Sequence, residues 1–545
     1  MHNARELKND KRPTRTHFEQ HDHEETILAI VKKLPVAEGQ RRQLEIISPA
    51  DMRPIGVIDV MTHDEVAMAL SRAREAQKAW AKRPFSERAG FMLKALDVLL
   101  DKQEEFIEVI LKETPKTRNE AIAMDIFTAA DSLLYYASAA EKILKPERRA
   151  VHGLIGLGKK LEIHHRPLGV IGIVSPWNAP FILSLNPAVQ ALMAGNAVMI
   201  KPSSATPFAG GLVGKLFKEA GLPEGLVTIL QGDSGTGQAL LEVGCDKISF
   251  TGSEGVGRHV GVTCAQRFIP CSLELGGKNP FIVCADANLE HAAAGAIAGN
   301  FMNAGQYCGG NELVYVERSV AAEFIRRVKE RVDRLRQSNT GEFDVGALYT
   351  ADQLKLVEEQ VNDAIEKGAT VVSGGRRNPD LEGLYFLPTV LTDVTDDMRV
   401  VSEETFGPVM TIVPLDNIED AVARSNATNY GLTASVWSTD IEKAKRIGTA
   451  IDTGCVDINA YPSSYGTAEA PFGGRKASGI GQVNGPSGLR SYCHAQPVQV
   501  DRQGGKQMLS IYPHSAKADQ GFQNMLKFLY GTRFGRWLVM LKFRF

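Results

Sequence analysis

The sequence predicts an α/β protein built on a parallel sheet with helices on both faces. Short apolar runs alternate with segments of helical period, and the helical segments are roughly 10–15 residues long, which is typical of βαβ units. A chain of 545 residues also exceeds what one hydrophobic core supports, and a second αβ region follows at residues 286–452. The expected strands are residues 169–174, 197–200, 226–230 and 247–250, and the expected helices between them are 181–194, 207–220 and 237–243.

Composition and charge exclude several classes of protein. Apolar residues make up 43% and charged residues 23% of the chain, as in an ordinary globular protein. The formal net charge of −2 gives no reason to expect a nucleic-acid partner. The seven cysteines form neither CxxC pairs nor a disulfide scaffold, so we expect a reducing, cytoplasmic compartment and no metal site.

The N-terminal residues 1–26 are charged and contain no apolar run that could serve as a signal peptide. We expect this segment to be disordered or loosely docked, within an N-terminal tail that comprises residues 1–40. His21 and His23 could together ligate a metal, although a solvated tail explains them more simply.

The next residues predict a strand pair followed by helices. Apolar alternation indicates short strands within residues 42–60. Thr62 and Glu65 have the spacing of a capping box, which predicts a helix over residues 62–82. Helical periodicity then continues, with breaks, over residues 86–144.

Residues 151–166 alternate apolar and polar side chains and contain several glycines, a pattern that predicts a β-hairpin extending from the body. Unpaired edge strands would invite aggregation. We therefore expect this hairpin to pair with other subunits, in a homodimer or a homotetramer.

Cys308 ends a segment, residues 301–308, that is too rich in glycine for a helix interior and too polar for a core strand. Gly305 precedes the cysteine and two glycines follow it, so a substrate could approach the main chain closely. Such a backbone can display a thiol nucleophile. A lone cysteine taken by itself is more often a buried structural residue.

Two segments together carry a family resemblance. Phe-x-Asn-x-Gly-Gln-x-Cys at residues 301–308 resembles the catalytic cysteine segment of the aldehyde dehydrogenase superfamily, and Leu-Glu-Leu-Gly-Gly-Lys at residues 273–278 resembles its general-base segment. The resemblance runs from about residue 45 to about residue 500. It implies a Rossmann-like cofactor domain, an α/β catalytic domain and a small β oligomerisation arm. The implied bounds are 41–147 with 167–276 for the cofactor domain, 277–484 for the catalytic domain, and 148–166 with 485–503 for the arm.

The resemblance implies catalytic roles for three residues. Cys308 would attack the aldehyde carbon, and Asn178 would donate its side-chain amide to the resulting oxyanion together with the Cys308 backbone N–H. Glu274, in a partly apolar cleft, would have a raised pKa and would activate the water that hydrolyses the thioester. Relatives that pass the acyl group to coenzyme A usually lack this glutamate, so water is the expected acceptor. Taken alone, Asn178 would be a turn residue and Glu274 a surface carboxylate.

The resemblance also implies NAD or NADP as the cofactor. Gly252, Ser253 and Gly257 match the family's nucleotide turn, where a helix amino terminus can approach a pyrophosphate, although the turn lacks the GxGxxG pattern and is a weak signal alone. Lys201 would bind the adenosine ribose. Ser204 stands where the family often has a glutamate that disfavours the 2′-phosphate of NADP, so we expect NADP to be tolerated or preferred.

At the other end of the cofactor, the resemblance implies contacts from Trp177, Glu404 and Phe406. Glu404 would bind the nicotinamide ribose, and Phe406 would pack near the nicotinamide ring. One face of the helix after Asn178 would line the substrate tunnel, with core packing as the alternative for its leucine. The residues of this face are Ala179, Leu183 and Asn186, whose small or polar side chains suggest a roomy entrance.

Residues 504–545 form an extension beyond the resemblance. Residues 521–545 contain five basic and no acidic side chains, with apolar residues near helical spacing. A basic, aromatic-rich amphipathic helix suits the surface of an anionic membrane, and the longest apolar run, residues 537–541, is far too short to cross one. A helix docked on the body or across the tunnel mouth is an equal alternative. Gly531 and Gly535 weaken any single continuous helix.

We therefore predict an NAD(P)+-dependent aldehyde dehydrogenase that hydrolyses its acyl-enzyme. We expect the protein to be cytoplasmic, and peripheral membrane contact through its tail is an open option. A narrower oxidiser of a semialdehyde, for example succinate semialdehyde, would need a cationic anchor in the tunnel, which the sequence does not locate. A catalytically silent relative that binds nucleotide or membrane is a third option. The intact Cys308, Glu274 and Asn178 argue against it.

Overall fold

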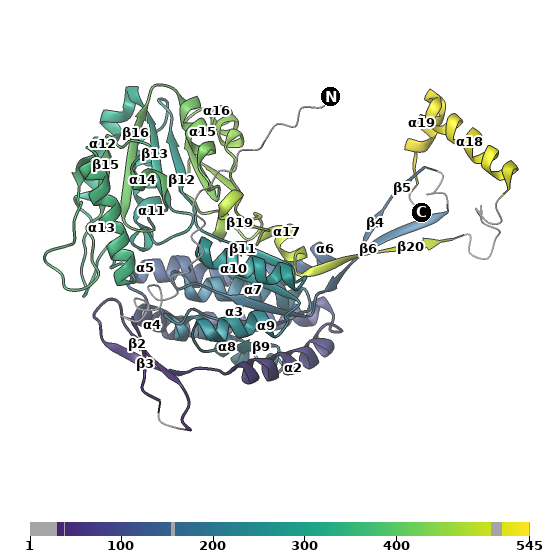
Figure 1. The fold of residues 1–545 in the computed structure, drawn as a ribbon, viewed down its shortest axis with the longest axis horizontal. Helices are drawn as coiled ribbons and strands as arrows, with labels where there is room; N and C mark the ends of the chain where they lie inside the picture. Colours follow the sequence, from purple (N-terminus) through teal and green to yellow (C-terminus); the bar gives the residue numbers. More distant parts are fainter. Residues whose placement is uncertain (1–29, 37–38, 154–157, 503–514, 544–545) are drawn as a thin grey trace, which may run out of the picture.

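The computed structural model describes residues 30–36, 39–153, 158–502 and 515–543. Two αβ bodies lie against each other, and an arm of long strands projects from them with a pair of helices at its end (Figure 1). The predicted N-terminal tail, with His21 and His23, falls mostly on residues 1–29 and so lies outside the described part of the chain.

A small antiparallel sheet opens the described chain. It consists of β1 (Val31–Lys33), β2 (Gln43–Ile47) and β3 (Pro54–Asp59), in that order. The strands β2 and β3 confirm the prediction for residues 42–60. The strand β1 lies within residues 1–40, the predicted N-terminal tail: Ile30 and Val31 are buried, and their burial holds the strand on β2.

The helices that follow agree with the sequence pattern. The helix α2 (His63–Trp80) begins after Thr62, whose hydroxyl accepts a hydrogen bond from the Glu65 N–H while the Glu65 carboxylate accepts one from the Thr62 N–H, so the capping box is confirmed. The predicted helical stretch of residues 86–144 contains α3 (Phe85–Asp101), α4 (Gln103–Glu113), α5 (Arg118–Glu120), a π-helical segment (Ala121–Phe127) and α6 (Thr128–Leu144).

The first large sheet has six strands in the order β19-β11-β10-β7-β8-β9, parallel except for the pair β19 and β11. The helices α7 and α8 cover one face, and α2, α9 and α10 cover the other. This confirms the predicted alternation. The bounds are β7 (Val170–Val174), α7 (Pro180–Met193), β8 (Ala197–Lys201), α8 (Pro207–Glu219), β9 (Val227–Ile229), α9 (Ser234–Glu242), β10 (Lys247–Thr251), α10 (Glu254–Gln266), β11 (Cys271–Glu274) and β19 (Gly479–Ile480).

The second large sheet has seven strands in the order β14-β15-β16-β13-β12-β17-β18, parallel except for β14. The helices α11 and α12 pack on one face, and α15 and α16 pack on the other. The bounds are β12 (Asn279–Val283), α11 (Leu289–Phe301), β13 (Asn311–Glu317), α12 (Arg318–Val332), α13 (Ala351–Glu366), β14 (Thr370–Ser373), β15 (Thr389–Thr392), α14 (Arg399–Ser402), β16 (Val409–Leu415), α15 (Ile418–Ala427), β17 (Thr433–Trp437), α16 (Ile441–Ala450) and β18 (Cys455–Ile458).

One loop ties the two bodies together. The strand β19 falls within the predicted catalytic domain of residues 277–484, yet it pairs with β11 of the first sheet. The Leu275 N–H also donates to the Ser478 carbonyl, 3.0 Å away. The segment around residue 479 therefore belongs to the first sheet, because its backbone supplies the partner of the edge strand; the other domain bounds stay a prediction.

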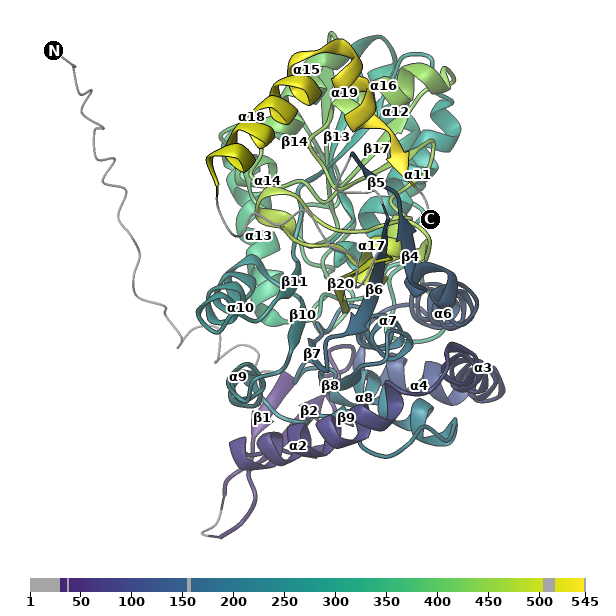
Figure 2. The same ribbon diagram turned by 90° about the vertical axis from the view of Figure 1, so that its right-hand side faces the viewer.

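The arm is a three-stranded antiparallel sheet that stands out from the bodies in Figure 1 and points toward the viewer in Figure 2. Its central strand β6 (Lys159–Pro167) pairs along its whole length with β20 (Cys493–Asp501) and more briefly with β4 (Glu147–Arg149). The short helix α17 (Gly485–Arg490) leads into β20. The second strand of the predicted hairpin is confirmed as β6, but the strand that pairs with it, β4, lies wholly before residue 151.

The C-terminal extension forms two helices, α18 (Ala516–Gly531) and α19 (Arg533–Met540), followed by the strand β21 (Lys542–Phe543). The strand β21 pairs with β5 (Val151–His152), which anchors the helices to the arm and away from both large sheets (Figure 1). The alternative prediction, that the tail docks on the body of its own chain, is therefore wrong. Within the described residues, no helix is long and apolar enough to cross a membrane.

Candidate active site

Cys308 follows a strained turn at the end of α11. A single 3₁₀ turn (Met302–Gly305) contains Asn303 and Ala304 with φ of 53° and 54°, and Gly305 follows with φ of 74°. A Cβ on Gly305 would lie 2.0 Å from the Gly407 carbonyl oxygen, so only glycine fits. Left-handed backbone at non-glycine residues is held only where the surroundings fix it. The turn stops the helix and redirects the chain toward β13, with Cys308 on the intervening loop.

Asn279 fixes the loop that carries the cysteine. Its side-chain amide donates hydrogen bonds to the carbonyls of Cys308 and Gly310, both at 2.8 Å. Its carbonyl oxygen accepts from the Thr433 N–H at 3.0 Å. Because Asn279 belongs to β12 and Thr433 to β17, two neighbouring strands hold the cysteine loop. This role follows from contacts between distant residues and leaves no local signal in the sequence.

Asn178 lies beside the same turn. Its amide nitrogen donates to the Gln306 carbonyl at 3.1 Å, and its own carbonyl accepts from the side-chain amide of Asn303 at 3.1 Å. A third bond comes from the Lys116 ammonium to the Asn178 carbonyl at 3.0 Å. The structure therefore brings Asn178, which follows the carboxyl end of β7, into contact with Gln306, two residues before Cys308.

Lys116 is held by a buried ion pair that the sequence does not reveal. Its ammonium lies 2.8 Å from the Asp125 carboxylate, and both side chains are fully buried. The other Asp125 oxygen accepts from the Ile182 N–H, in the first turn of α7, at 3.1 Å. This pair thus links the π-helical segment, α7 and Asn178 into one rigid support.

Glu274 ends β11 and is 5% exposed. Neither of its carboxylate oxygens has a hydrogen-bond partner among the described residues. Burial raises the pKa of this carboxyl well above its ordinary value, and the Lys247 ammonium opposes the shift. A buried carboxyl without a hydrogen bond destabilises the fold unless a ligand or a water molecule forms hydrogen bonds with it.

The cysteine thiol and the carboxyl of Glu274 act on each other electrostatically. Burial raises the pKa of Cys308 to about 12, and the carboxylates of Glu404 and Glu274 add to the rise. Cys308 is therefore a neutral thiol in the resting protein. A thiol in this state needs a base to become a nucleophile.

Glu404 lies near the same thiol. Its carboxylate accepts from the Gly277 N–H at 2.9 Å, and burial together with the Glu312 carboxylate raises its pKa to about 8. A buried ion pair of Lys278 and Glu312 holds the segment that follows Glu404. The Glu312 carboxylate also accepts from the N–H groups of Thr405 and Phe406, at 2.8 and 2.9 Å.

An aromatic cluster surrounds the position of Phe406. The ring of Trp177 stacks on Tyr349 at a centroid distance of 4.6 Å and meets Phe406 edge-on at 5.7 Å. The Tyr349 hydroxyl donates to the Ala205 carbonyl at 2.7 Å. Trp177 and Phe406, which were predicted from segments far apart in the sequence, thus lie together.

Lys201 ends β8 and is 6% exposed. No described residue forms a hydrogen bond or an ion pair with its ammonium, and burial lowers its pKa to about 8. Ser204 follows three residues later on the loop before α8. A buried ammonium without a partner fits an anionic or hydroxyl-rich ligand.

The turn after β10 also fits a phosphate-bearing ligand. Ser253 caps α10 without a side-chain hydrogen bond, so the first N–H groups of this helix have no side-chain acceptor from their cap. The Gly252 N–H donates to the Glu274 carbonyl at 3.1 Å. Gly257 has a different use: a Cβ there would lie 2.4 Å from a methyl carbon of Leu275, so this glycine lets α10 pack against the segment after β11. Together with Lys201, these residues fit a dinucleotide.

The predicted tunnel residues are all buried in α7 or at its start. Asn186 donates to Asn484 at 2.7 Å and to the Tyr465 hydroxyl at 3.3 Å, and it accepts from Ser132 at 2.9 Å. The Tyr465 ring packs edge-on against Phe472, and both belong to the hydrophobic cluster around Cys308. Asn186 is thus a member of a buried polar network, and contact of Ala179, Leu183 and Asn186 with substrate stays a prediction.

All seven cysteines are free. In the described ranges, no group of three or more His, Cys, Asp or Glu side chains could hold a metal ion.

These features define a class of protein, an α/β oxidoreductase that uses a dinucleotide and a cysteine. The chain belongs to the aldehyde dehydrogenase family, which it matches over residues 36–498. Enzymes of this family oxidise aldehydes with NAD(P)+.

Three relatives place the chain within the family. A Mycolicibacterium smegmatis protein, assigned by name as a succinate-semialdehyde dehydrogenase of the NADP(+) type, is 41% identical over 454 residues, which are 83% of this chain and 87% of the relative. A Methylomonas protein named 4,4'-diapolycopene aldehyde oxidase is 35% identical over 485 residues, or 89% of this chain and 91% of the relative. The solved Mycobacterium tuberculosis aldehyde dehydrogenase complexed with NAD+ has a TM-score of 0.80 and 34% identity, over 87% of this chain and 98% of that chain.

Proposed function

We propose that this protein oxidises an aldehyde to the carboxylic acid with NAD+ or NADP+, through a thioester on Cys308 that water hydrolyses. The observation that carries the proposal is the convergence of Cys308, Asn178 and the unpaired carboxyl of Glu274 from three separate elements. Each has the chemistry that one step requires.

The first step is addition of the Cys308 sulfur to the aldehyde carbon. The carbonyl π bond becomes an oxyanion, which the Asn178 amide and the Cys308 backbone N–H stabilise by hydrogen bonds. The thiol must lose its proton, because its pKa of about 12 keeps it neutral at rest. The thiol proton passes to solvent, so the Glu274 carboxylate stays available to take a proton from water in the third step.

The second step converts the adduct to a thioester. When bound, the dinucleotide supplies the nicotinamide that takes up the hydride from the former aldehyde carbon. Lys201 and Ser204 would hold its adenosine ribose, and the turn of Gly252 and Ser253 would hold its pyrophosphate, with Gly257 allowing α10 to pack closely behind this turn. Glu404 would hold the nicotinamide ribose, and Trp177 and Phe406 would contact the nicotinamide ring.

The third step is hydrolysis. The Glu274 carboxylate takes a proton from water, and the resulting hydroxide attacks the thioester carbon. The C–S bond breaks, the carboxylic acid leaves, and the thiolate recovers a proton. Glu274 therefore makes water the acceptor of the acyl group.

Succinate-semialdehyde oxidation is the second candidate, because several relatives carry that name. Such a substrate would place a second carboxylate in the tunnel and would require a cation there. Cys308 packs against a hydrophobic cluster of Leu432, Cys455, Phe472 and Val483, which gives it an apolar setting on that side. We therefore favour an uncharged aldehyde.

The arm and the extension give two further proposed contacts. The long β6–β20 pair leaves a strand edge that another subunit can extend, so we propose a homodimer or a homotetramer. We also propose that α18 and α19 make a peripheral contact with a membrane, in a protein that otherwise resides in the cytoplasm.

Reduction of NAD+ and NADP+, followed by absorbance, tests the function. Purified protein would be given butanal, longer aliphatic aldehydes, an aromatic aldehyde and succinate semialdehyde. The variant Cys308→Ala should lose at least about three orders of magnitude in turnover while still binding nucleotide, and Cys493→Ala should retain activity. Turnover by Cys308→Ala, or none by the wild type, would refute the assignment; faster turnover of succinate semialdehyde than of butanal would select the second candidate.

A further inference from the structure

The C-terminal helices stand at the far end of the arm rather than on either body (Figures 1 and 2). Their anchor is the pairing of β21 with β5, in which Lys542 lies opposite His152. Leu529 and Gly535 are buried where α18 meets α19. The two helices therefore pack on each other and present their remaining side chains outward.

Large apolar side chains dominate what these helices expose. Phe528, Phe534 and Trp537 form an aromatic cluster, with centroid distances of 6.3 Å for Phe528–Phe534 and 5.7 Å for Phe534–Trp537. These three rings are 47%, 59% and 57% exposed. Leu526, Tyr530 and Met540 are exposed to a similar degree. So concentrated an apolar surface indicates a partner.

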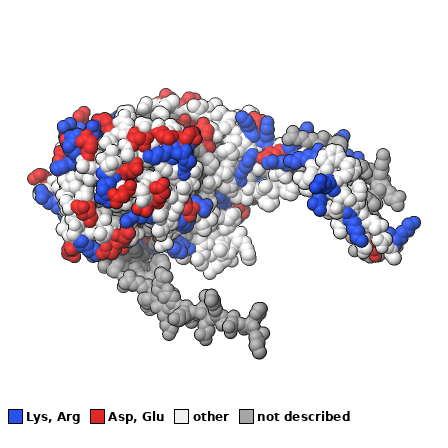
Figure 3. Space-filling model, turned by 90° about the horizontal axis from the view of Figure 1, so that it is seen from above, with Lys and Arg blue, Asp and Glu red and all other residues white. Residues whose placement is uncertain are grey.

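The charge around this surface has one sign. Among the described residues of the extension, one side chain is acidic, Asp519, and the basic side chains are Lys517, Lys527, Arg533, Arg536 and Lys542. In Figure 3, Lys and Arg side chains also gather along the arm that carries these helices. The apolar surface is thus rimmed by positive charge.

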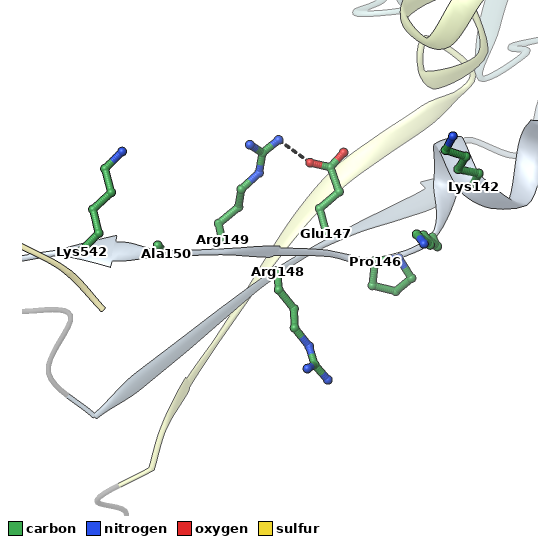
Figure 4. A pocket seen from close by; sticks show the side chains of 8 residues that line it. Lys142, Pro146, Glu147, Arg148, Arg149, Ala150 and Lys542 are labelled. Carbon is green, nitrogen blue, oxygen red and sulfur yellow. Dashed lines mark hydrogen bonds and ion pairs between the residues drawn. The ribbon is translucent and has the colours of Figure 1, made fainter. Parts of the chain in front are cut away.

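A cavity of about 700 Å³ lies along the arm, from the end of α6 past β4 to Lys542, and it is also rich in basic side chains. Its lining contains one acidic side chain and five basic ones, and one of these five is Lys542 of the extension. Figure 4 shows Lys142, Glu147, Arg149 and Lys542 projecting on the same side of the strand, with Arg148 on the other. The remaining basic residue is Lys145.

The single carboxylate of the cavity is already neutralised. Glu147 pairs with Arg149, and it lies 2.6 Å from Arg490. Lys142, Lys145 and Lys542 have no carboxylate partner among the described residues. Three unpaired ammonium groups therefore face one cavity, and their charge is complementary to an anion.

We infer that the cavity and the C-terminal helices together form a binding site for the anionic headgroups of a lipid bilayer. The exposed aromatic and aliphatic side chains enter the interfacial layer, where aromatic rings with a polar edge are favoured. The unpaired lysines bind the phosphate groups at its surface. The inference rests on the membrane contact proposed above and is independent of the aldehyde chemistry.

A second copy of this chain is a poorer occupant. A symmetric contact of this surface with itself would oppose the same cations on both sides, and like charges in contact cost several kcal/mol. An anionic bilayer instead offers opposite charge together with an apolar layer. Helices of this length can lie in the interface but cannot cross it.

Flotation of the full chain with lipid vesicles tests the site. One set of vesicles contains phosphatidylcholine alone, and the other an equal mixture of phosphatidylcholine and phosphatidylglycerol. We expect binding to the mixed vesicles and much weaker binding to the neutral ones. The double variant Lys142→Gln with Lys542→Gln should lower binding to mixed vesicles by about tenfold or more, and so should Trp537→Ser.

Matched controls separate a specific site from general charge or stickiness. Lys355→Gln with Lys445→Gln removes two exposed lysines from the body, and Phe268→Ser removes an aromatic side chain that is 95% exposed there. These controls should bind as the wild type does, and all variants should oxidise a short aldehyde at the same rate.

Each other outcome contradicts a distinct claim. Equal binding to both kinds of vesicle would leave the membrane contact standing and refute the anionic headgroup site. Binding to neither would refute both, whatever the enzymatic activity. A change of oligomeric state in Trp537→Ser, measured by light scattering, without vesicle binding would assign the surface to a second copy.

Discussion

The side-chain amide of Asn178 donates a hydrogen bond to the main-chain carbonyl of Gln306, 3.1 Å away and two residues before Cys308. Asn178 follows a strand of the first sheet, whereas Gln306 precedes a strand of the second. The Gln306 side chain is itself fixed, since its oxygen accepts from the Tyr349 N–H at 2.8 Å. The proposed donor to the oxyanion is thus oriented before any substrate arrives.

Replacement of Asn178 should slow the chemical step and leave nucleotide binding unchanged. We expect Asn178→Ala to lower kcat by about 10²- to 10³-fold, because one preorganised donor to the oxyanion is lost. The affinity for NAD(P)+, measured by fluorescence titration, should stay the same. Asn186→Ala, another buried asparagine of the same region, serves as the comparison; an equal loss of kcat in both variants would argue for a general packing defect.

Glu274→Gln should trap the acyl-enzyme. The amide keeps the size of the side chain but cannot accept a proton from water, so the thioester forms and is not hydrolysed. Intact mass spectrometry after mixing with aldehyde and NAD(P)+ should show the protein plus one acyl group. Glu366→Gln, at the surface end of α13, provides the control. Unchanged steady-state turnover in Glu274→Gln would remove this residue as the base.

Hydrolysis should accelerate as the pH rises. Burial raises the pKa of Glu274 well above its ordinary value, so the carboxylate that acts as base is scarce at low pH and accumulates as the pH approaches the raised pKa. The rate of acyl release, followed by mass spectrometry after a single turnover, should increase with pH in the wild type. In Glu274→Gln it should lose most of this dependence. Release that is independent of pH in the wild type would contradict the assigned role.

Ser204→Glu should shift the cofactor preference toward NAD+. A carboxylate at this position would repel the 2′-phosphate of NADP+, and we expect the affinity for NADP+ to fall about tenfold or more, equivalent to about 1.4 kcal/mol. The affinity for NAD+ should change little. Ser204→Gln adds the same bulk without charge and should behave as the wild type if repulsion is the cause. Equal losses for both cofactors would place Ser204 outside the ribose site.

Lys116→Met should destabilise the fold strongly. It leaves the fully buried Asp125 carboxylate without its cation, a loss of about 3–5 kcal/mol for pairs of this kind. Lys355→Met breaks an exposed pair with Glu359 and should cost about 0–1 kcal/mol. Thermal unfolding followed by circular dichroism compares the two. Similar midpoints for both variants would show that the Lys116–Asp125 pair contributes little net stability.

Much of the fold could be predicted because its signals are local. The capping box at Thr62 and Glu65 acts over three residues, and the strand and helix periods of residues 169–250 act over one element at a time. The exceptions are β1 and β19. These short strands have too few residues to carry a period, and each is defined by the neighbour with which it pairs.

The candidate site divides in the same way. Short motifs in the sequence predicted site roles for Cys308, Glu274, Asn178 and Lys201, and no motif pointed to Asn279, Lys116 or Asp125. Asn279 and Lys116 donate hydrogen bonds to the main-chain carbonyls of Cys308 and Asn178, which are tens of residues away in the sequence. Lys116 and Asp125 form an ion pair with each other. No local pattern encodes such a contact.

By itself, the sequence determined the alternation of strands and helices, the family resemblance and the residue types available for the chemistry, because those depend on near neighbours along the chain. The tertiary structure alone decided which buried groups are paired. Among the residues that the structure describes, the carboxyl of Glu274 and the ammonium of Lys201 have no partner, the Lys116 ammonium pairs with Asp125, and the C-terminal helices lie at the end of the arm. The reason is physical: burial and pairing depend on distance in space, and the energy of a buried charge depends on what surrounds it.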